Sequence, residues 1–254
     1  MSFTHVFITR PRKESGELAA MLSRIGLQSL VQPAFIYLQV DARHAQQEVF
    51  SEMDMAGSSA LVVFTSPRSV AHGLSQLPDS IRFKSRIAAI GPATAKALSE
   101  AGIRVNVIPR KGYTSEALLE TLGGEGPAGA AGRPFAFIIA AAGGRQALFE
   151  GLGEQGWRPR LVKVYKPEPA PLDKQALNAL GEASGVLSVW TSANSIRALS
   201  QRLPPAVWFQ LCQGDWLVIS DRLKRFARAY GPARVHLAPG PGNEDLFSAI
   251  RNLR

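Results

Sequence analysis

The stretch VVFTSPRSVAHGL, residues 62–74, passes from an apolar run through a polar elbow into a helical pattern. The elbow, Thr-Ser-Pro-Arg, offers hydroxyls and a guanidinium at the start of a helix, and Ser66 is a candidate N-cap. The stretch therefore predicts a strand, a tight elbow and a helix. This is the unit from which α/β folds with parallel sheets are built.

Short apolar runs of the same kind recur along the chain, at residues 5–9, 60–64, 86–90, 135–140, 186–190 and 215–220. They lack the strict alternation of a half-exposed strand, which is typical of strands buried on both faces. Helical patterns such as residues 16–26 lie between them. The alternation predicts an α/β fold with parallel sheets and helices on both faces.

The two halves of the chain resemble each other at a shift near 130 residues. Three blocks match in order: 7–26 with 137–156, 64–74 with 190–199, and 89–109 with 218–239. An ordered repeat of this length predicts two similar doubly wound domains, which also suits a chain of 254 residues.

The charge of the chain indicates an anionic partner. The formal net charge is +9, and 21 of the 29 cationic residues are arginine. Guanidinium groups suit carboxylates and phosphates, and here they are scattered instead of forming the stripe typical of nucleic-acid binding. We expect a small polyanion, with no nucleic acid and no membrane as partner.

The lack of an apolar run of about 20 residues and of a signal-peptide pattern leads us to expect a cytoplasmic protein.

The elbows after the strands carry the candidate binding residues. In an open parallel sheet, ligands bind beyond the carboxyl ends of the strands, where helix N-termini favour anions. The candidates are Thr65, Ser66, Arg68, Gly91, Thr94, Thr191, Ser192 and Asn194. The alternative is that Ser66 and Ser192 only cap helices. Residues 143–145, Gly-Gly-Arg, are a further anion loop or only a turn.

The chain offers few other chemical groups. Cys212 is the only cysteine, and the four histidines, His5, His44, His72 and His236, lack ligand spacing, so no metal site is predicted. No dinucleotide or nucleoside-triphosphate motif is present. Tyr165 is the tyrosine whose phenol could take part in chemistry, and interface packing is its alternative role.

Taken together, the motifs FTSPRSV, AAIGPATAKAL, VIPRKGYTSEALLETL, LVKVYKP and WTSANSI resemble those of the uroporphyrinogen-III synthase family, and the resemblance covers essentially the whole chain. It implies two flavodoxin-like doubly wound domains joined by a two-stranded β-ladder linker. One domain would comprise residues 1–37 plus 167–254, and the other residues 38–166. Composition alone suggests GGEGPAGAAGRP, residues 123–134, as the linker, whereas the resemblance makes it a surface loop.

The resemblance also implies a reaction. Members of the family convert the linear tetrapyrrole hydroxymethylbilane, which carries eight carboxylates, to uroporphyrinogen III with loss of water and inversion of ring D. The expectation is a cofactor-free, metal-free monomeric lyase that acts in the interdomain cleft and receives its substrate from the preceding pathway enzyme.

Individual residues match the motifs of the family. Tyr165 falls on the tyrosine proposed to assist loss of the hydroxyl, and Arg10 on the end of the first strand. The elbow positions of the family are occupied by Ser66, Arg68, Thr94 and Ser192. The chain departs from the pattern at residues 220–223, Ser-Asp-Arg-Leu, where the family often has Gly-Pro-x-Thr. Ser220 or Arg222 would then replace the missing threonine.

Two other functions are compatible with parts of the sequence. A two-lobed cytosolic sensor that binds a small anion without catalysis would share the fold and the cleft. A nucleic-acid-binding protein would share the positive charge.

Overall fold

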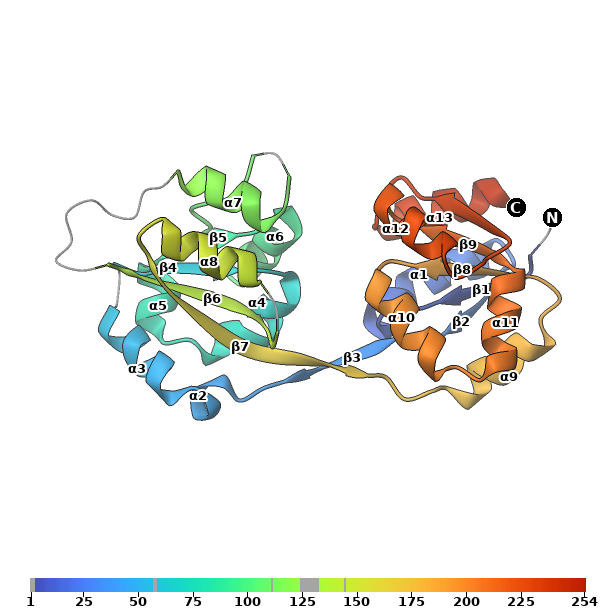
Figure 1. Cartoon of the computed structure of the whole chain (residues 1–254), viewed down its shortest axis with the longest axis horizontal. Coiled ribbons are helices and arrows are strands. Elements are labelled where there is room, and N and C mark those ends of the chain that lie inside the picture. Colours follow the sequence, from blue (N-terminus) through green and yellow to red (C-terminus); the bar gives the residue numbers. More distant parts are fainter. Residues whose placement is uncertain (1–2, 57–58, 111, 124–132, 144) are drawn as a thin grey trace. The chain divides into compact units, whose positions relative to one another are not determined.

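The computed structural model describes residues 3–56, 59–110, 112–123, 133–143 and 145–254 (Figure 1). The chain divides into two compact units: unit 1 is Met1–Ile36 with Glu168–Arg254, and unit 2 is Tyr37–Pro167. The sequence placed the two borders at 37/38 and 166/167. The expected surface loop at residues 123–134 lies almost wholly outside the described residues.

Unit 1 contains a five-stranded sheet in the order β10-β9-β8-β1-β2. Its strands are β1 (His5–Ile8), β2 (Gln28–Val31), β8 (Val186–Trp190), β9 (Asp215–Val218) and β10 (Arg234–Leu237). All neighbouring strands pair in parallel. Counted along the chain, the order is 2-1-3-4-5, which is that of a flavodoxin-like sheet. The predicted α/β class is confirmed.

Helices cover both faces of this sheet because alternate residues of each buried strand point to opposite sides. Val6 and Ile8 of β1 belong to a cluster with α1 (Arg12–Arg24) and α13 (Asn243–Leu253). Phe7 belongs to a second cluster on the other face. The helices of that cluster are α9 (Lys174–Glu182), α10 (Ala193–Arg202), α11 (Pro205–Gln213) and α12 (Asp221–Arg228).

Unit 2 contains a second sheet in the order β3-β7-β6-β4-β5. Its strands are β3 (Phe35–Gln39), β4 (Leu61–Phe64), β5 (Arg86–Ala89), β6 (Phe135–Ala141) and β7 (Arg158–Pro169). The pairs β4–β5, β4–β6 and β6–β7 are parallel, and Val107 forms a parallel bridge to Ala88 beside β5. The internal repeat matches β6 with β1, β7 with β2, β4 with β8 and β5 with β9, so the spatial order from β7 to Val107 corresponds to that of unit 1. Counted along the chain it runs 5-4-1-2-3, which is a circular permutation of the order in unit 1. β3 is added beside β7.

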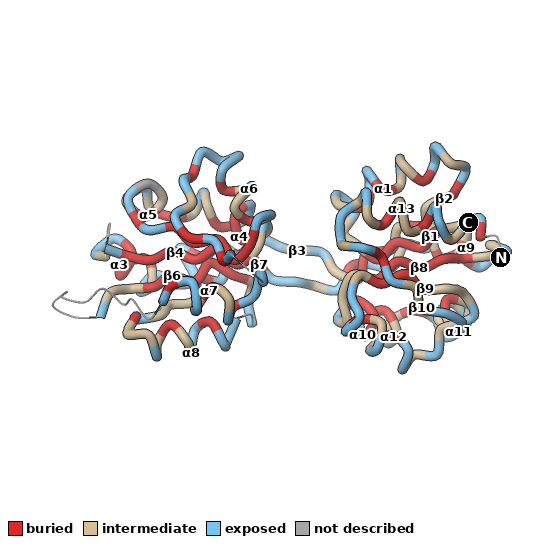
Figure 2. The backbone as a smooth tube through the Cα atoms, turned by 90° about the horizontal axis from the view of Figure 1, so that it is seen from above, coloured by how far each residue is buried: buried red, intermediate tan, exposed pale blue. Residues whose placement is uncertain are grey.

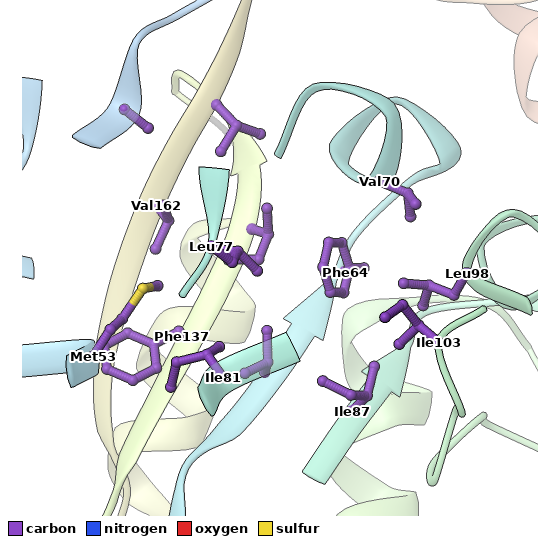
Figure 3. Close-up of a cluster of buried hydrophobic side chains, with 14 of the residues drawn as sticks. Met53, Phe64, Val70, Leu77, Ile81, Ile87, Leu98, Ile103, Phe137 and Val162 are labelled. Atoms are coloured by element: carbon purple, nitrogen blue, oxygen red, sulfur yellow. The ribbon is translucent and has the colours of Figure 1, made fainter. Parts of the chain in front are cut away.

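The two faces of the second sheet are covered by different helices. One cluster, drawn in Figure 3, joins Phe64, Ile87 and Phe137 of the sheet to the first group of helices. That group is α2 (Ala42–Ala45), α3 (Gln47–Ala56), α4 (Pro67–Gly73), α5 (Asp79–Lys84) and α6 (Pro92–Glu100), with a 3₁₀ turn, η2 (Leu74–Gln76). The other cluster packs α7 (Ser115–Leu122) and α8 (Gln146–Glu154) on the opposite face. Figure 2 shows the buried strands at the centre of each unit.

The chain passes between the units in β3 and β7, which are neighbours in the second sheet (Figure 1). Backbone hydrogen bonds flank this passage, from Val40 N–H to the Val164 carbonyl and from Ala170 N–H to the Ala34 carbonyl. The described part of the chain contains no helix with the length and apolarity needed to cross a lipid bilayer.

One ion pair ties α3 to β7 inside unit 2. The guanidinium of Arg160 donates from Nε and Nη2 to the two carboxylate oxygens of Glu52, at 2.6 and 2.7 Å. Only 12% of the Glu52 side chain is exposed, so water cannot replace either partner fully. Loss of the carboxylate would leave a partly buried guanidinium without its main acceptor.

We expect Glu52→Ala to lower the free energy of unfolding by about 2 kcal/mol, which is typical of a lost charge-assisted pair. Glu52→Gln retains an acceptor and should cost less. Urea unfolding measures both. Glu100→Ala is the control, because its ion pair with Lys96 is solvent-exposed and worth little. A Glu52→Ala effect as small as that of the control would contradict the prediction.

Candidate active site

The carboxyl ends of the parallel strands bring the predicted elbows to one edge of each sheet. In unit 2, residues 65–66 follow β4, Gly91 follows β5 and residues 142–145 follow β6. Tyr165 lies in β7 opposite Ala141, directly after a register shift that sets Val164 out of the pairing. The Ala142 N–H donates to the Tyr165 carbonyl at 3.0 Å, which fixes the strand at this point.

The elbow after β4 begins α4 as the sequence predicts. Ser66 is its N-cap, and its Oγ accepts from the Ser69 N–H at 3.0 Å. The Ser66 N–H in turn donates to the Ser69 Oγ at 3.1 Å, which completes a capping box. The Ser66 hydroxyl makes a further contact besides the capping bond, because its Oγ also lies 3.2 Å from the Tyr165 Oη. The two hydroxyl groups therefore share a hydrogen bond.

Thr65 has a different task in the same elbow. Its Oγ1 donates to the Ile139 carbonyl of β6 at 3.0 Å, and the residue is only 4% exposed. This bond ties the elbow to the neighbouring strand. We therefore assign Thr65 to holding Ser66 in place, and its expected contact with a ligand stays a prediction.

Tyr165 is surrounded by aromatic and cationic groups of unit 2. It is 7% exposed, and its ring centroid lies 5.4 Å from that of His72 and 5.9 Å from that of Tyr37. The guanidinium of Arg68 lies over the ring of Tyr37, 4.1 Å from its centroid. A phenol, a serine hydroxyl and a guanidinium are thus gathered at one strand end.

The imidazole of His72 is held toward its neutral form. Burial lowers its pKa from 6.5, and the positive charge of Arg68 lowers it further. Both causes disfavour the protonated ring. Sequence reasoning assigned His72 no role, because its partner Tyr165 is remote in the sequence.

The elbow after β5 brings Gly91 and Tyr113 together. Gly91 is the N-cap of α6 in extended conformation, so its backbone does not require glycine. A Cβ there would lie 3.0 Å from the Cβ and 3.2 Å from the Cγ of Tyr113. The missing side chain lets Tyr113, which is 58% exposed, lie against the start of α6. Thr94 is buried in the first turn of that helix.

Arg145, the N-cap of α8, is the one non-glycine residue with a positive φ in the described part of the chain, at 76°. Its Nη2 donates to the Thr65 carbonyl at 3.2 Å. Such backbone conformations are uncommon outside glycine and concentrate at functional sites. From the sequence, residues 143–145 are compatible with either an anion-binding loop or a simple turn. Gly144 lies outside the described residues.

The predicted elbows of unit 1 line one pocket of about 500 Å³. Five of the expected residues contribute to it: Thr191, Ser192, Asn194, Ser220 and Arg222. Ser192 is the N-cap of α10 and accepts from the Ser195 N–H at 3.0 Å. Ser220 is the N-cap of α12 and accepts from the Leu223 N–H at 3.2 Å. Two helix N-termini therefore border the pocket.

Sequence reasoning missed Arg197 and Phe226, which also line this pocket. The Arg197 guanidinium lies 4.7 Å from the centroid of the Phe226 ring, and its Nη1 donates to the Asn194 Oδ1 at 3.4 Å. An arginine on a helix surface gives no signal in the sequence that distinguishes it from a solvated charge. Its site role becomes visible only when α10 and α12 are placed side by side.

Arg10 follows β1 at the same edge of the unit 1 sheet but is not among the residues that line the pocket. Its Nη1 donates to the Asn243 Oδ1 at 2.8 Å, and its Nη2 lies 3.7 Å from the Glu14 Oε2. These contacts join the first elbow to α1 and α13. A direct role in binding stays a prediction for Arg10.

The arrangement is suited to anions and to proton transfer. Helix N-termini, hydroxyls and guanidinium groups bind carboxylates, and a phenol in contact with a serine hydroxyl can donate a proton. Within the described residues, no group of three or more histidine, cysteine, aspartate or glutamate side chains could hold a metal ion.

The lowered pKa of His72 predicts a pH-dependent contribution to stability. Between 6.5 and the lower folded-state pKa, the unfolded chain binds a proton that the folded chain does not, so stability falls as the pH falls through this interval. We expect wild type to lose stability relative to His72→Gln between pH 7.5 and pH 5.5. Urea midpoints at both values measure this, with His44→Gln as the control for losing a histidine. Parallel midpoints for wild type and His72→Gln would refute the prediction.

The comparisons with known proteins agree on one family. A family model described as uroporphyrinogen-III synthase HemD matches residues 16–248. The chain is 26% identical to the uroporphyrinogen-III synthase of Escherichia coli K12 over 255 aligned positions, which cover 97% of this chain and 99% of that protein. It is 34% identical over 122 residues to a protein of Methanothermobacter thermautotrophicus to which the same activity is assigned. That match spans 46% of each chain.

Solved structures show the same fold. A mutant uroporphyrinogen III synthase of the extreme thermophile Thermus thermophilus superposes with a TM-score of 0.62 at 20% identity, covering 98% of both chains. Uroporphyrinogen-III synthetase of Helicobacter pylori 26695 gives a TM-score of 0.61 at 14% identity, covering 98% of this chain and 99% of that one. With the family model matched over residues 16–248, the chain belongs to the uroporphyrinogen-III synthase family of cyclising lyases, which act on hydroxymethylbilane.

Proposed function

We propose that this chain converts hydroxymethylbilane to uroporphyrinogen III, with loss of water and inversion of ring D, and without a cofactor. Elbows of both units bind one substrate molecule, in the cleft that the family resemblance implies. The observation that carries this proposal, beyond membership of the family, is the hydrogen bond between the Tyr165 phenol and the Ser66 hydroxyl. It supplies a positioned proton donor at a strand end.

The first chemical step is departure of the substrate hydroxyl. The carbon–oxygen bond breaks more readily when the oxygen takes up a proton, so a donor within hydrogen-bonding distance accelerates the step. In this proposal Tyr165 gives its proton to the leaving hydroxyl, which departs as water. Ser66 orients the phenol, and the proton returns when the macrocycle closes and the attacking pyrrole carbon is deprotonated.

The second requirement is control of substrate conformation. The cation left by loss of water is reactive, so the product isomer depends on which pyrrole carbon is held near it. A pocket of about 500 Å³ accommodates only part of a tetrapyrrole, which suits one end of the substrate with its carboxylate arms. Ser192, Ser220 and Arg222 bind those carboxylates in this proposal. Either Ser220 or Arg222 takes the place of the threonine of the family.

The test of the function is the product isomer. The chain is incubated with hydroxymethylbilane and the uroporphyrinogens are separated, with an enzyme-free sample as reference for spontaneous closure. We expect uroporphyrinogen III in excess. Formation of type I alone, at the enzyme-free rate, would reject the proposal and would favour a sensor that binds without turnover. Sedimentation of the active sample tests the proposed monomer.

Tyr165→Phe should lower kcat by about 100-fold, the usual scale for loss of a general acid, with KM little changed. The substitution removes the phenol oxygen and keeps the ring contacts with Tyr37 and His72. Tyr230→Phe is the matched control, since it removes a phenol from the aromatic cluster of unit 1. A kcat equal to that of wild type would return Tyr165 to a packing role.

Arg222→Ala should raise KM roughly 10- to 100-fold, as expected for loss of a charge-assisted hydrogen bond to a carboxylate. Arg228→Ala removes the same charge from the same helix, at an exposed position that does not line the pocket. Steady-state kinetics compare the two. Equal effects would mean that α12 acts only through its overall positive field.

A further inference from the structure

Tyr37 is the residue of β3 whose ring contacts both a predicted binding group and the predicted proton donor. The Arg68 guanidinium carbon lies 4.1 Å from the centroid of the Tyr37 ring. The centroid of Tyr165 lies 5.9 Å away, with the two ring planes at 69°. Arg68 belongs to α4 and Tyr165 to β7, so the side chain of Tyr37, from β3, connects a helix residue with a residue of another strand.

Both contacts have the geometry of attractive interactions. A guanidinium within about 6 Å of a ring centroid is drawn to the negative face of the ring. Two aromatic rings at about 5–6 Å and near-perpendicular planes place the positive edge of one against the negative face of the other. The Tyr37 ring is therefore bound from two directions and is itself held in one orientation.

Each contact restricts a group that must be ordered for catalysis. The Arg68 side chain has several rotatable bonds, and restricting it before substrate arrives lowers the entropy cost of binding a carboxylate. The ring of Tyr165 must point its Oη at Ser66 and at the leaving hydroxyl. An aromatic neighbour against that ring opposes its displacement.

We propose that Tyr37 is a positioning residue that holds the Arg68 guanidinium and the Tyr165 phenol in a fixed relation, so that one end of the substrate is bound and activated together. The inference rests on the proposed function and deepens it. Tyr37 itself touches neither the leaving group nor a carboxylate in this proposal. It acts through its two partners.

A purely structural role makes a different prediction. Tyr37 also packs against the hydrophobic cluster of unit 2, which includes Phe64 and Val164. If that packing were its whole role, loss of the ring would lower stability and leave kcat and KM of the folded enzyme unchanged. The kinetic parameters of folded variants therefore distinguish the two roles.

The experiment compares Tyr37→Phe with Tyr37→Leu in the full chain, using hydroxymethylbilane as substrate. Phenylalanine keeps the ring and both contacts, so kcat and KM should stay within about twofold of wild type. Leucine removes the ring, and we expect KM to rise and kcat to fall by about tenfold each. Tyr37→Ile, a better strand former, replaces the leucine variant if circular dichroism shows that the latter is unfolded.

Double variants assign each effect to its partner. With Arg68→Ala already present, Tyr37→Leu should raise KM no further. With Tyr165→Phe present, it should lower kcat no further. Phe247→Leu is the control, because it removes an arginine–aromatic contact with Arg251 on α13, outside the site. It should leave both parameters unchanged.

The outcomes separate this inference from the proposed function. A folded Tyr37→Leu with wild-type kinetics, or with effects that add fully to those of Arg68→Ala and Tyr165→Phe, overturns the inference while uroporphyrinogen III is still formed. Wild type that forms only type I overturns the proposed function and the inference with it. Non-additive effects in both double variants support the positioning role.

Discussion

Parallel pairing of the strands is the constraint on which the sites of this chain depend. It places the carboxyl ends of β1, β8 and β9 at one edge of the first sheet and those of β4, β5 and β6 at one edge of the second. Each strand end leads into a helix whose free N–H groups face the same edge. The polar elbows of one sheet therefore lie next to one another, where their side chains can contact the same ligand.

The caps show how far such an elbow is used by the fold itself. Ser66 and Ser192 each accept a hydrogen bond from the backbone three residues later. Stability alone would explain both serines. The two serines differ in the second hydrogen bond of the side-chain hydroxyl. The Ser66 hydroxyl is hydrogen-bonded to the Tyr165 phenol, whereas the Ser192 hydroxyl is hydrogen-bonded to that of Ser195. Capping and the proposed role in the site are therefore compatible in one side chain.

The class of fold and the elbows could be predicted from sequence because they depend on local patterns and on the internal repeat. Buried strands, serine caps and helical spacing each depend on residues that are close together in the sequence. The contacts of Tyr37 with Arg68 and of Arg145 with Thr65 could not be predicted, because they join residues 31 and 80 positions apart. The left-handed conformation of Arg145 contradicts its local preference, so only the surrounding structure reveals it.

The two elbows of the repeat differ at the positions for which a chemical role is proposed. At the shift that aligns Thr65 with Thr191, Arg68 corresponds to Asn194 and His72 to Ala198. Unit 2 thus holds a guanidinium and an imidazole against the rings of Tyr37 and Tyr165, whereas the elbow of unit 1 borders a pocket with Arg197 and Arg222. A symmetric pair of sites would treat both ends of a repetitive substrate alike. The proposed reaction breaks a bond at one end and inverts the ring at the other, so divergence of the two elbows is what this chemistry requires.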